Sequence, residues 1–122
     1  MKSKKLIIFL LILSFVSFFI GCKQKVVSNL KIVKMGPTVI KVGKDFNIQP
    51  DGANAIWIQT ENATKTTVVC WEETKLKTAV ANPQAVSANV PKELYSKPGQ
   101  YQVYLLDTQT GAKSNVMVIT VE

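Results

Sequence analysis

Hydrophobic and polar residues alternate most regularly just after the turn pair Pro98-Gly99. One face of this segment consists of Tyr101, Val103 and Leu105. The other face consists of Gln100, Gln102 and Tyr104. A period of two with one apolar face is typical of a half-buried β-strand. We therefore predict a strand here and expect it to be the central strand of a small β-sandwich.

Further short segments have a similar alternation or a β-rich composition. They cover residues 30–33, 38–42, 46–50, 55–60, 66–71, 74–80, 85–90 and 113–121. Turn-forming residues lie between most of them, and the stretch 91–95, which begins with Pro91, fits a single helical turn. Beyond the N-terminal region no segment has a sustained period of 3.6 residues. Short strands separated by turns predict an all-β sandwich or barrel.

The same alternation predicts which side chains point away from the core. If Met117, Ile119 and Val121 point inward on the last strand, the residues between them point outward. The outer apolar face would then consist of Tyr104, Leu106, Val116 and Val118. A contiguous exposed apolar patch usually marks an interface, so this face is a candidate interaction surface. Two alternatives stay open: a neighbouring loop covers the face, or the register differs by one residue and inverts the assignment.

The large aromatic residues divide between core and surface roles. We expect Trp57 and Trp71 in the core, because a domain this small needs its largest side chains inside. Trp57 is also a candidate member of the interaction surface. Together with Tyr95 it is a candidate platform for a sugar ring if either aromatic is exposed. An exposed aromatic in a groove would favour a glycan ligand, whereas a flat apolar patch would favour a protein.

The N-terminal region has the layout of a secretory signal. A basic start with three lysines precedes residues 6–20, which are apolar except for two serines. This run is shorter than the ~20 residues that a bilayer-spanning helix usually needs. The sequence Phe19-Ile20-Gly21-Cys22 that follows resembles a bacterial lipobox, although Phe19 stands where that motif usually has Leu.

The lipobox resemblance implies that signal peptidase II cuts before Cys22 and that this cysteine carries a covalent lipid, including palmitate. We therefore expect a signal peptide at 1–21, a short tether at 22–29 and one domain at 30–122. The mature protein would be held at an extracytoplasmic face of a bacterial membrane, since two or more acyl chains anchor stably. The alternative is an uncleaved signal anchor in which Cys22 has no role.

Composition excludes several functions. Loss of the three signal lysines leaves 12 lysines against 8 acidic residues, a net charge of +4. We do not expect this excess to bind nucleic acid, because the domain would lie outside the cytoplasm. With Cys22 acylated, Cys70 has no partner for an internal disulfide and is expected to be a small buried strand residue.

Candidate catalytic chemistry is also sparse. The chain has no histidine, so the commonest general base and ordinary zinc sites are absent from the sequence. It has no arginine to clamp a phosphate or a carboxylate. Glu72 and Glu73 are adjacent, and on an extended strand they would point to opposite faces rather than share a proton. We therefore expect no enzyme activity, no metal site and no cofactor other than the lipid.

The order of turns and strands from Pro37 onwards resembles the IPT/TIG family of immunoglobulin-like domains. The matching pieces are Pro37, 43–48, Gly52-Ala53-Asn54, 67–71, Leu76, Val90-Pro91, 98–105 and 114–121. The resemblance implies a single immunoglobulin-like Greek-key β-sandwich. Two departures are Ala55 in place of an aromatic residue and Glu72-Glu73 in place of a glycine turn. The second departure predicts a longer or differently shaped hairpin.

The immunoglobulin-like fold also implies a role for the opening segment. In such domains a tyrosine near the start of this strand forms a corner, with a buried ring and a hydroxyl bonded to backbone upstream. Pro98, Gly99 and Tyr101 are the expected corner residues.

Two functions remain after these exclusions. The first is a membrane-anchored, non-catalytic module of the cell envelope that binds a protein partner or has a structural role. The second is a module that binds carbohydrate or peptidoglycan through exposed aromatic residues. The fold resemblance alone does not separate them, since function depends on the site and not on the fold.

Overall fold

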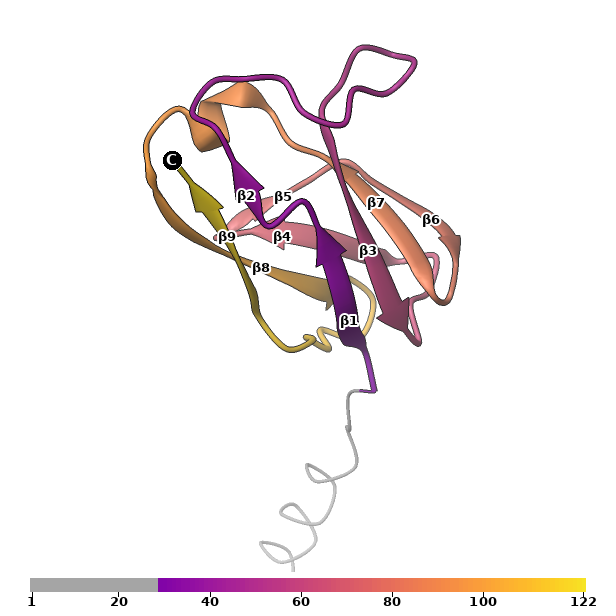
Figure 1. Cartoon of the computed structure of the whole chain (residues 1–122). Helices are drawn as coiled ribbons and strands as arrows, with labels where there is room; N and C mark the ends of the chain where they lie inside the picture. The colour runs from indigo at the N-terminus through magenta and orange to yellow at the C-terminus, as the bar shows by residue number, and fades with distance from the viewer. Residues whose placement is uncertain (1–28) are drawn as a thin grey trace, which may run out of the picture.

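The computed structural model describes residues 29–122, and nearly all of its regular structure is β-strand (Figure 1). The strands are β1 (Lys31–Gly36), β2 (Val39–Ile40), β3 (Ala55–Glu61), β4 (Thr67–Trp71), β5 (Thr74–Lys75), β6 (Thr78–Asn82), β7 (Ala85–Asn89), β8 (Gly99–Asp107) and β9 (Met117–Val121). One short 3-10 helix, η1, spans Lys92–Tyr95. Within residues 29–122 there is no helix with the length and apolar character that crossing a bilayer requires.

The strands form two sheets packed face to face, which confirms the predicted all-β sandwich (Figure 1). The four-stranded sheet has the order β1-β3-β7-β6, and the five-stranded sheet has the order β2-β9-β8-β4-β5. The first order matches the ABED sheet of an immunoglobulin domain, and the second contains the GFC order as β9-β8-β4, with β2 and β5 added at its edges. Strand β8 lies in the middle of the five-stranded sheet, as its alternation predicted.

The first predicted strand is divided between the two sheets at Gly36-Pro37, a cis peptide bond. Before it, β1 pairs antiparallel with β3 at the edge of the four-stranded sheet. After it, β2 pairs parallel with β9 at the edge of the five-stranded sheet. Because proline has no N–H to donate, its place between two edge strands leaves no ladder hydrogen bond unmade.

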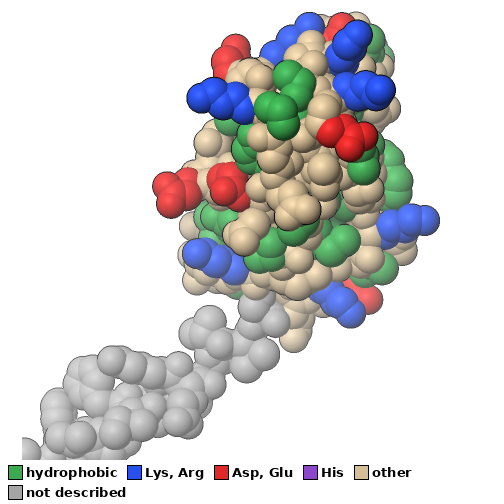
Figure 2. All heavy atoms as spheres, turned by 60° about the vertical axis from the view of Figure 1, so that its left-hand side comes forward, with side chains coloured by type: hydrophobic (Ala, Val, Ile, Leu, Met, Phe, Trp, Pro, Cys, Tyr) green, Lys and Arg blue, Asp and Glu red, His purple; other side chains and the backbone are tan. Residues whose placement is uncertain are grey.

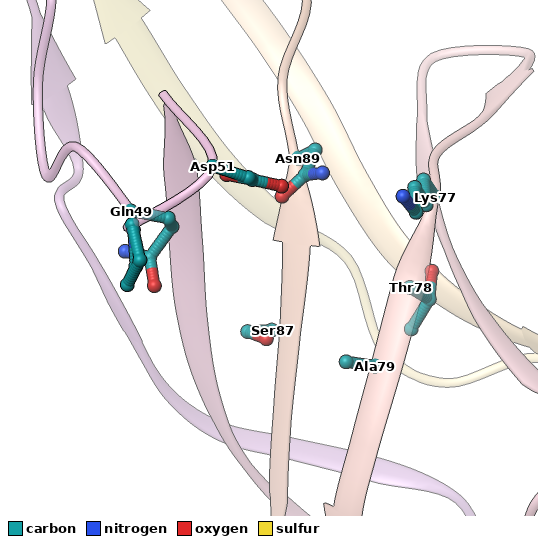
Figure 3. A pocket seen from close by; sticks show the side chains of 8 residues that line it. Gln49, Asp51, Lys77, Thr78, Ala79, Ser87 and Asn89 are labelled. Atoms are coloured by element: carbon teal, nitrogen blue, oxygen red, sulfur yellow. The ribbon is translucent and has the colours of Figure 1, made fainter. Parts of the chain in front are cut away.

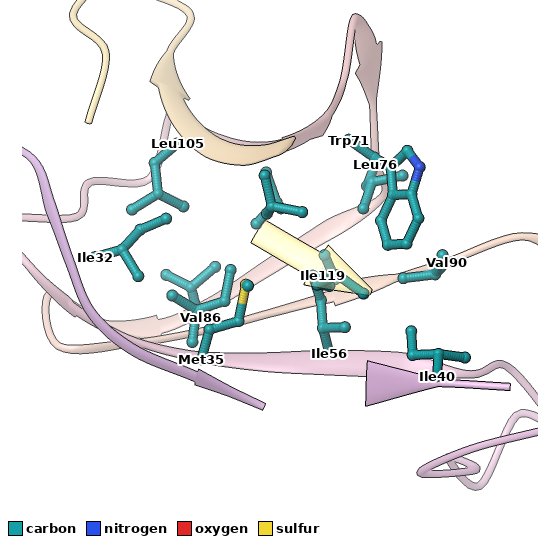
Figure 4. Close-up of a cluster of buried hydrophobic side chains, with 14 of the residues drawn as sticks. Ile32, Met35, Ile40, Ile56, Trp71, Leu76, Val86, Val90, Leu105 and Ile119 are labelled. Carbon is teal, nitrogen blue, oxygen red and sulfur yellow. The ribbon is translucent and has the colours of Figure 1, made fainter. Parts of the chain in front are cut away.

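The core lies between the sheets and is filled by side chains of both (Figure 4). On β8, Val103 and Leu105 are fully buried, and Trp71 of β4 is only 1% exposed. From the four-stranded sheet, Ile56 and Ile58 of β3 point toward them and are buried as well. The inward face of β8 therefore carries the residues that its alternation assigned to it.

The predicted corner region has the expected hydrogen bond. The hydroxyl of Tyr101 donates to the carbonyl oxygen of Lys97, four residues upstream, at 2.8 Å. The Tyr101 ring is half-buried rather than fully buried, and its centroid lies 5.3 Å from that of Trp71. Gly99 has a φ of 156°, a backbone conformation that residues with a side chain rarely adopt, so the corner favours glycine at this position.

Several predicted strands differ from the observed ones, and the last of them, predicted over 113–121, begins only at Met117. Residues 46–50 form a loop with a single bridge between Ile48 and Asn54, because the backbone bonds within itself and Asn47 adopts a positive φ of 40°. Residues 74–80 contain two strands, β5 and β6, which belong to different sheets. No turn residue such as Gly, Pro or Asn separates the two strands in the sequence, so the sequence does not indicate the change of sheet.

The hairpin at Glu72-Glu73 is not longer, which was one of the two predicted alternatives. Trp71 pairs with Thr74, so the turn has two residues. Glu72 adopts a positive φ of 52°, a conformation for which glycine is usually chosen. Its carboxylate accepts a hydrogen bond from the backbone N–H of Gln102 at 2.6 Å, which gives the glutamate a compensating contact.

Candidate functional site

The outer face of the four-stranded sheet carries one large exposed aromatic residue, Trp57. Its side chain is 44% exposed, whereas Ile56 and Ile58 on either side of it are buried. Trp57 pairs with Gly36 of β1 on one side and with Ser87 of β7 on the other. The indole therefore stands on the solvent side of the sheet between two small residues.

Gly36 provides the space that the indole occupies. A Cβ placed on Gly36 would clash with the six-membered ring and the ring nitrogen of Trp57, so the ring lies directly against the glycine backbone. The φ of Gly36 is not in the positive region, so the requirement for glycine is one of space and not of conformation. A glycine on one strand beneath an aromatic ring of the next is a known way to protect a strand edge.

An apolar hollow of about 300 Å³ adjoins the indole. It is lined by Trp57, Ala79, Val80, Ala81, Ala85, Val86 and Ser87. Because most of these side chains are small, the floor beside the ring is low. Trp57 supplies the wall of this hollow on the β3 side.

A second hollow of about 350 Å³ is polar and lies next to the first (Figure 3). It is lined by Gln49, Pro50, Asp51, Lys77, Thr78, Ala79, Ser87 and Asn89. Ala79 and Ser87 belong to both hollows, so the two are continuous along β6 and β7. We call the pair the Trp57 groove.

The polar groups of the Trp57 groove are only partly used within the domain. Asp51 accepts a bond from the N–H of Ala53 at 3.0 Å, and the side-chain amide of Gln49 donates to the carbonyl oxygen of Asn47. Lys77 forms no ion pair with any carboxylate of residues 29–122, where the salt bridge found joins Lys92 to Asp45. Oxygen and nitrogen atoms are therefore available to a ligand at this end of the groove.

A buried network holds the loop that carries Gln49 and Asp51. The Asn54 amide donates to the Tyr95 hydroxyl at 2.8 Å and to Asp45 at 3.2 Å, and its oxygen accepts from the Phe46 N–H at 3.1 Å. Lys92 pairs with Asp45 at 3.0 Å. Hydrogen bonds from Lys92 and Asn54 hold the pKa of Asp45 below its usual value.

Tyr95, which the sequence left as a possible sugar platform, belongs to this network instead. It is 0% exposed, and its ring meets that of Phe46 edge to face at 5.4 Å between centroids. Burial raises the pKa of its hydroxyl. The prediction that Tyr95 presents a surface aromatic is therefore wrong, because η1 turns its side chain into the domain.

The predicted outer apolar face lies on the other sheet. Val116 and Val118 are 49% and 45% exposed, and Tyr104 and Leu106 are half-buried. On the side of the molecule that carries β8 and β9, charged side chains lie mainly near the outline, and hydrophobic and uncharged ones lie between them (Figure 2). Val118 pairs with Gln102, so polar side chains interrupt the apolar ones.

Tyr104 has more neighbours than the alternation indicated. It pairs with Cys70 of β4, which is buried although it points outward, and its ring lies 5.6 Å from the Lys113 ammonium. Burial first, then the Cys70 thiol and the Glu73 and Glu72 carboxylates, raise the pKa of the Tyr104 hydroxyl. Tyr104 therefore contributes a partly covered ring, and the two valines are the exposed part of this face.

The two tryptophans have opposite environments, although the sequence analysis expected both in the core and kept Trp57 as a candidate surface residue as well. Trp71 is in the core, and Trp57 is on the surface. The alternation of Ile56, Trp57 and Ile58 would have placed Trp57 outward, because the isoleucines on either side must face the core. The size of the Trp57 side chain therefore predicted its position wrongly, and the alternation of inward and outward residues along the strand predicts it correctly.

Other predicted features fall outside the described residues or have no counterpart within them. Cys22, the signal peptide 1–21 and most of the tether lie outside residues 29–122, so they remain predictions. Within residues 29–122 no three His, Cys, Asp or Glu side chains come close enough to hold a metal ion. The Trp57 groove has one carboxylate, that of Asp51.

No protein-family model matches this sequence, and no curated protein matches it either. The protein is therefore classified by its fold alone, as a β-sandwich with an immunoglobulin-like strand order.

Proposed function

We propose that this protein is a lipid-anchored, extracytoplasmic lipoprotein with an IPT/TIG-type domain that binds carbohydrate without transforming it. The lipobox-like sequence ending in Cys22 supports the anchor. The order of turns and strands from Pro37 onwards supports the domain type. The absence of histidine and arginine from the sequence supports a binding role rather than a catalytic one.

The observation that carries the carbohydrate proposal is the exposed indole of Trp57 beside a hollow. Sugar rings have apolar C–H faces that pack on aromatic rings and hydroxyl groups that bond to amides and carboxylates. The Trp57 groove has both kinds of surface next to each other. The indole and small apolar side chains line one half, and Asp51, Lys77 and Asn89 line the other. A few placed polar groups beside apolar surface are the usual composition of a small-ligand site.

A glycan array tests this function on the full chain in detergent micelles. The Trp57→Ala variant removes the indole and should lose binding to every glycan that the unaltered protein retains. The Val118→Ser variant is the matched control, since it changes an equally exposed residue of the other sheet. Equal retention by the Trp57→Ala variant, or no glycan retained by the unaltered protein, would show that the groove is not a carbohydrate site.

The lipid anchor has its own test. A Cys22→Ser substitution should abolish incorporation of labelled palmitate and release the protein from the membrane fraction. Membrane retention without labelling would instead support an uncleaved signal anchor. Either result is independent of what the domain binds.

A second candidate function is binding of an envelope protein through the outer apolar face. The specific support is the exposure of Val118 in β9 and of Val116, which directly precedes this strand. A pull-down from detergent-solubilised membranes would compare the unaltered protein with a Tyr104→Ser/Val118→Ser variant. Recovery of the same partners at equal strength by both would count against this face.

A further inference from the structure

We propose, on the basis of the carbohydrate function above, that the Trp57 groove accepts at least two consecutive sugars of a neutral glycan chain. One sugar stacks on the indole of Trp57. The next sugar lies in the polar hollow, where its hydroxyls bond to Asp51 and Lys77. The ligand is therefore an oligosaccharide, and a monosaccharide fills only half of the site.

The length of the groove carries the first step. Trp57 pairs with Ser87, and Asn89 lies two residues further along β7 on the same face. Two residues of an extended strand span about 7 Å, so the polar groups begin beyond the edge of a sugar centred on the indole. The residues at the junction are the small Ala79 and Ser87, and no bulky side chain divides the two hollows.

The charges in the polar hollow carry the second step. It contains one carboxylate, Asp51, and one ammonium group, Lys77, which are not paired with each other (Figure 3). Asp51 can only accept hydrogen bonds and Lys77 can only donate them, whereas a sugar hydroxyl does both. Two hydroxyls of one sugar can therefore satisfy both residues.

The same pair of charges gives no net attraction for a charged sugar. An anionic sugar would be repelled by the Asp51 carboxylate and attracted by the Lys77 ammonium group, and a cationic sugar the reverse. Asn89, at the end of β7, also lines this hollow and adds a neutral amide that can donate and accept (Figure 3). The hollow as a whole is electrically balanced, which favours a neutral ligand.

The position of the groove is consistent with a chain-like ligand. Residue 29, to which the tether would be joined, lies at the end of the domain where β1 begins (Figure 1). The loop with Gln49 and Asp51 lies at the opposite end of β3, so the polar half of the groove is the half farther from that point (Figure 1). The polar end of the groove therefore lies away from the end of the domain where residue 29 is found (Figure 1).

Calorimetric titration with oligosaccharide ladders of one to six sugars tests the proposal on the full chain in micelles. The neutral ladders are β-1,4-linked glucose, β-1,4-linked N-acetylglucosamine and α-1,4-linked glucose, and the anionic ladder is galacturonic acid. For at least one neutral ladder the affinity should rise about tenfold between one sugar and two or three, the value of one good hydrogen bond to a charged group. The galacturonic acid ladder should bind more weakly than that neutral one.

Two conservative substitutions assign the second sugar. Asp51→Asn keeps the acceptor oxygen for the Ala53 N–H but removes the charge, and Lys77→Gln removes the ammonium group. Each should return the affinity for a disaccharide close to the affinity for a monosaccharide, with no change for the monosaccharide itself. Lys75→Gln, on the exposed edge strand β5 of the other sheet, is the control and should change neither affinity.

The outcomes separate this inference from the function on which it rests. Binding that is lost in Trp57→Ala but is independent of chain length and of Asp51 and Lys77 overturns the two-sugar site and leaves the carbohydrate function in place. Stronger binding of the anionic ladder overturns the neutral ligand. Binding that survives in Trp57→Ala, or no binding of any ladder or array glycan, overturns both.

Discussion

Asn54 is the residue whose removal should most affect both the stability of the domain and the shape of its groove. Its side chain is buried and makes three hydrogen bonds, which join the loop carrying Gln49 and Asp51 to η1. An Asn54→Ala substitution removes all three. The loop would then be held by its backbone bonds, by the exposed Lys92–Asp45 pair, by the bond from the Asn47 side chain to the Ala55 carbonyl oxygen and by the packing of Phe46 on Tyr95.

The magnitude follows from the groups that are left without a partner. The Tyr95 hydroxyl is fully buried, and leaving such a group unsatisfied costs about 1–3 kcal/mol. Loss of the bond to the Phe46 N–H adds about 0.5–1.5 kcal/mol. We discount the exposed Asp45 contact and expect Asn54→Ala to lower the free energy of unfolding by about 2–4 kcal/mol.

A double-mutant cycle with Tyr95→Phe separates the unsatisfied hydroxyl from the other losses. Tyr95→Phe removes the hydroxyl but leaves the Asn54 amide bonded to Asp45, so it should cost about 1 kcal/mol. In the double variant no hydroxyl is left unsatisfied, so it should be no less stable than Asn54→Ala alone. Urea unfolding of the full chain in micelles, followed by the fluorescence of Trp71, measures each value.

Two results would refute this reasoning. A cost below about 0.5 kcal/mol for Asn54→Ala would mean that the network does not stabilise the fold. Strict additivity of the two single substitutions would mean that Asn54 and Tyr95 do not interact energetically. The first result would also remove the reason to expect an ordered polar hollow.

Three further predictions concern single residues. Trp71→Ala should cost about 3–5 kcal/mol in urea unfolding, whereas Trp57→Ala should cost less than about 1 kcal/mol, because only the first leaves a cavity in the core. Asp107→Asn should lower stability at neutral pH but make it less sensitive to acid. Hydrogen bonds from the Thr66 hydroxyl and from the Gln109 N–H lower the pKa of Asp107 in the folded protein. The stability that these bonds give the fold is therefore fully present above pH 3.8, the ordinary pKa, and is lost as the pH falls through the lower pKa of the folded state. Gly36→Ala should displace the Trp57 indole and weaken glycan binding several-fold, with urea unfolding changed by less than about 1 kcal/mol; unchanged binding would show that the position of the ring is not important.

Alternation predicted β8 and β9 of the five-stranded sheet well, because each of these strands has one buried face and one more open face. On β8 the inward and outward residues, including the buried Val103 and Leu105, fall where a period of two puts them. Alternation did not predict which outward side chains are buried by their neighbours. Cys70 points outward and is nevertheless buried opposite Tyr104, because cover from neighbouring side chains has no signature in the sequence of one strand.

The loop between β2 and β3 shows the opposite failure. Phe46 and Ile48 alternate with polar residues, yet only Phe46 packs against the core, and Ile48 is exposed. The segment bonds to itself, for example from the Gln49 N–H to the Ala53 carbonyl at 2.8 Å, and so has no neighbouring strand. A short period of two is compatible with both a strand and such a loop, and only tertiary contacts decide between them.

Only one part of the Trp57 groove could be predicted from the sequence. The tryptophan was a candidate site residue, whereas nothing in the sequence indicated the hollow beside it. Trp57 was identified as a candidate, but its neighbours come from strands 20 or more residues away in the sequence, such as Ala79 and Ser87. Alanine and serine carry no chemistry that would mark them as members of a site. Their importance comes only from their small size next to a large ring, which becomes apparent when the sheet order is known.

The two outer faces of the sandwich differ in shape more than in composition, and this difference assigns them to different ligands. If Trp57 served only to cover Gly36, the outward residues of β7 and β6 beside it could be polar residues of any size. Gln59, the next outward residue of β3, is an example of such a residue. Instead they are small, and they leave a hollow beside the ring that a sugar can enter. Val118, in contrast, pairs with Gln102 and is exposed together with Val116, and exposed apolar side chains of this kind suit a protein partner. A substitution on one face should therefore leave binding at the other unchanged, and the Trp57→Ala and Val118→Ser variants are controls for each other.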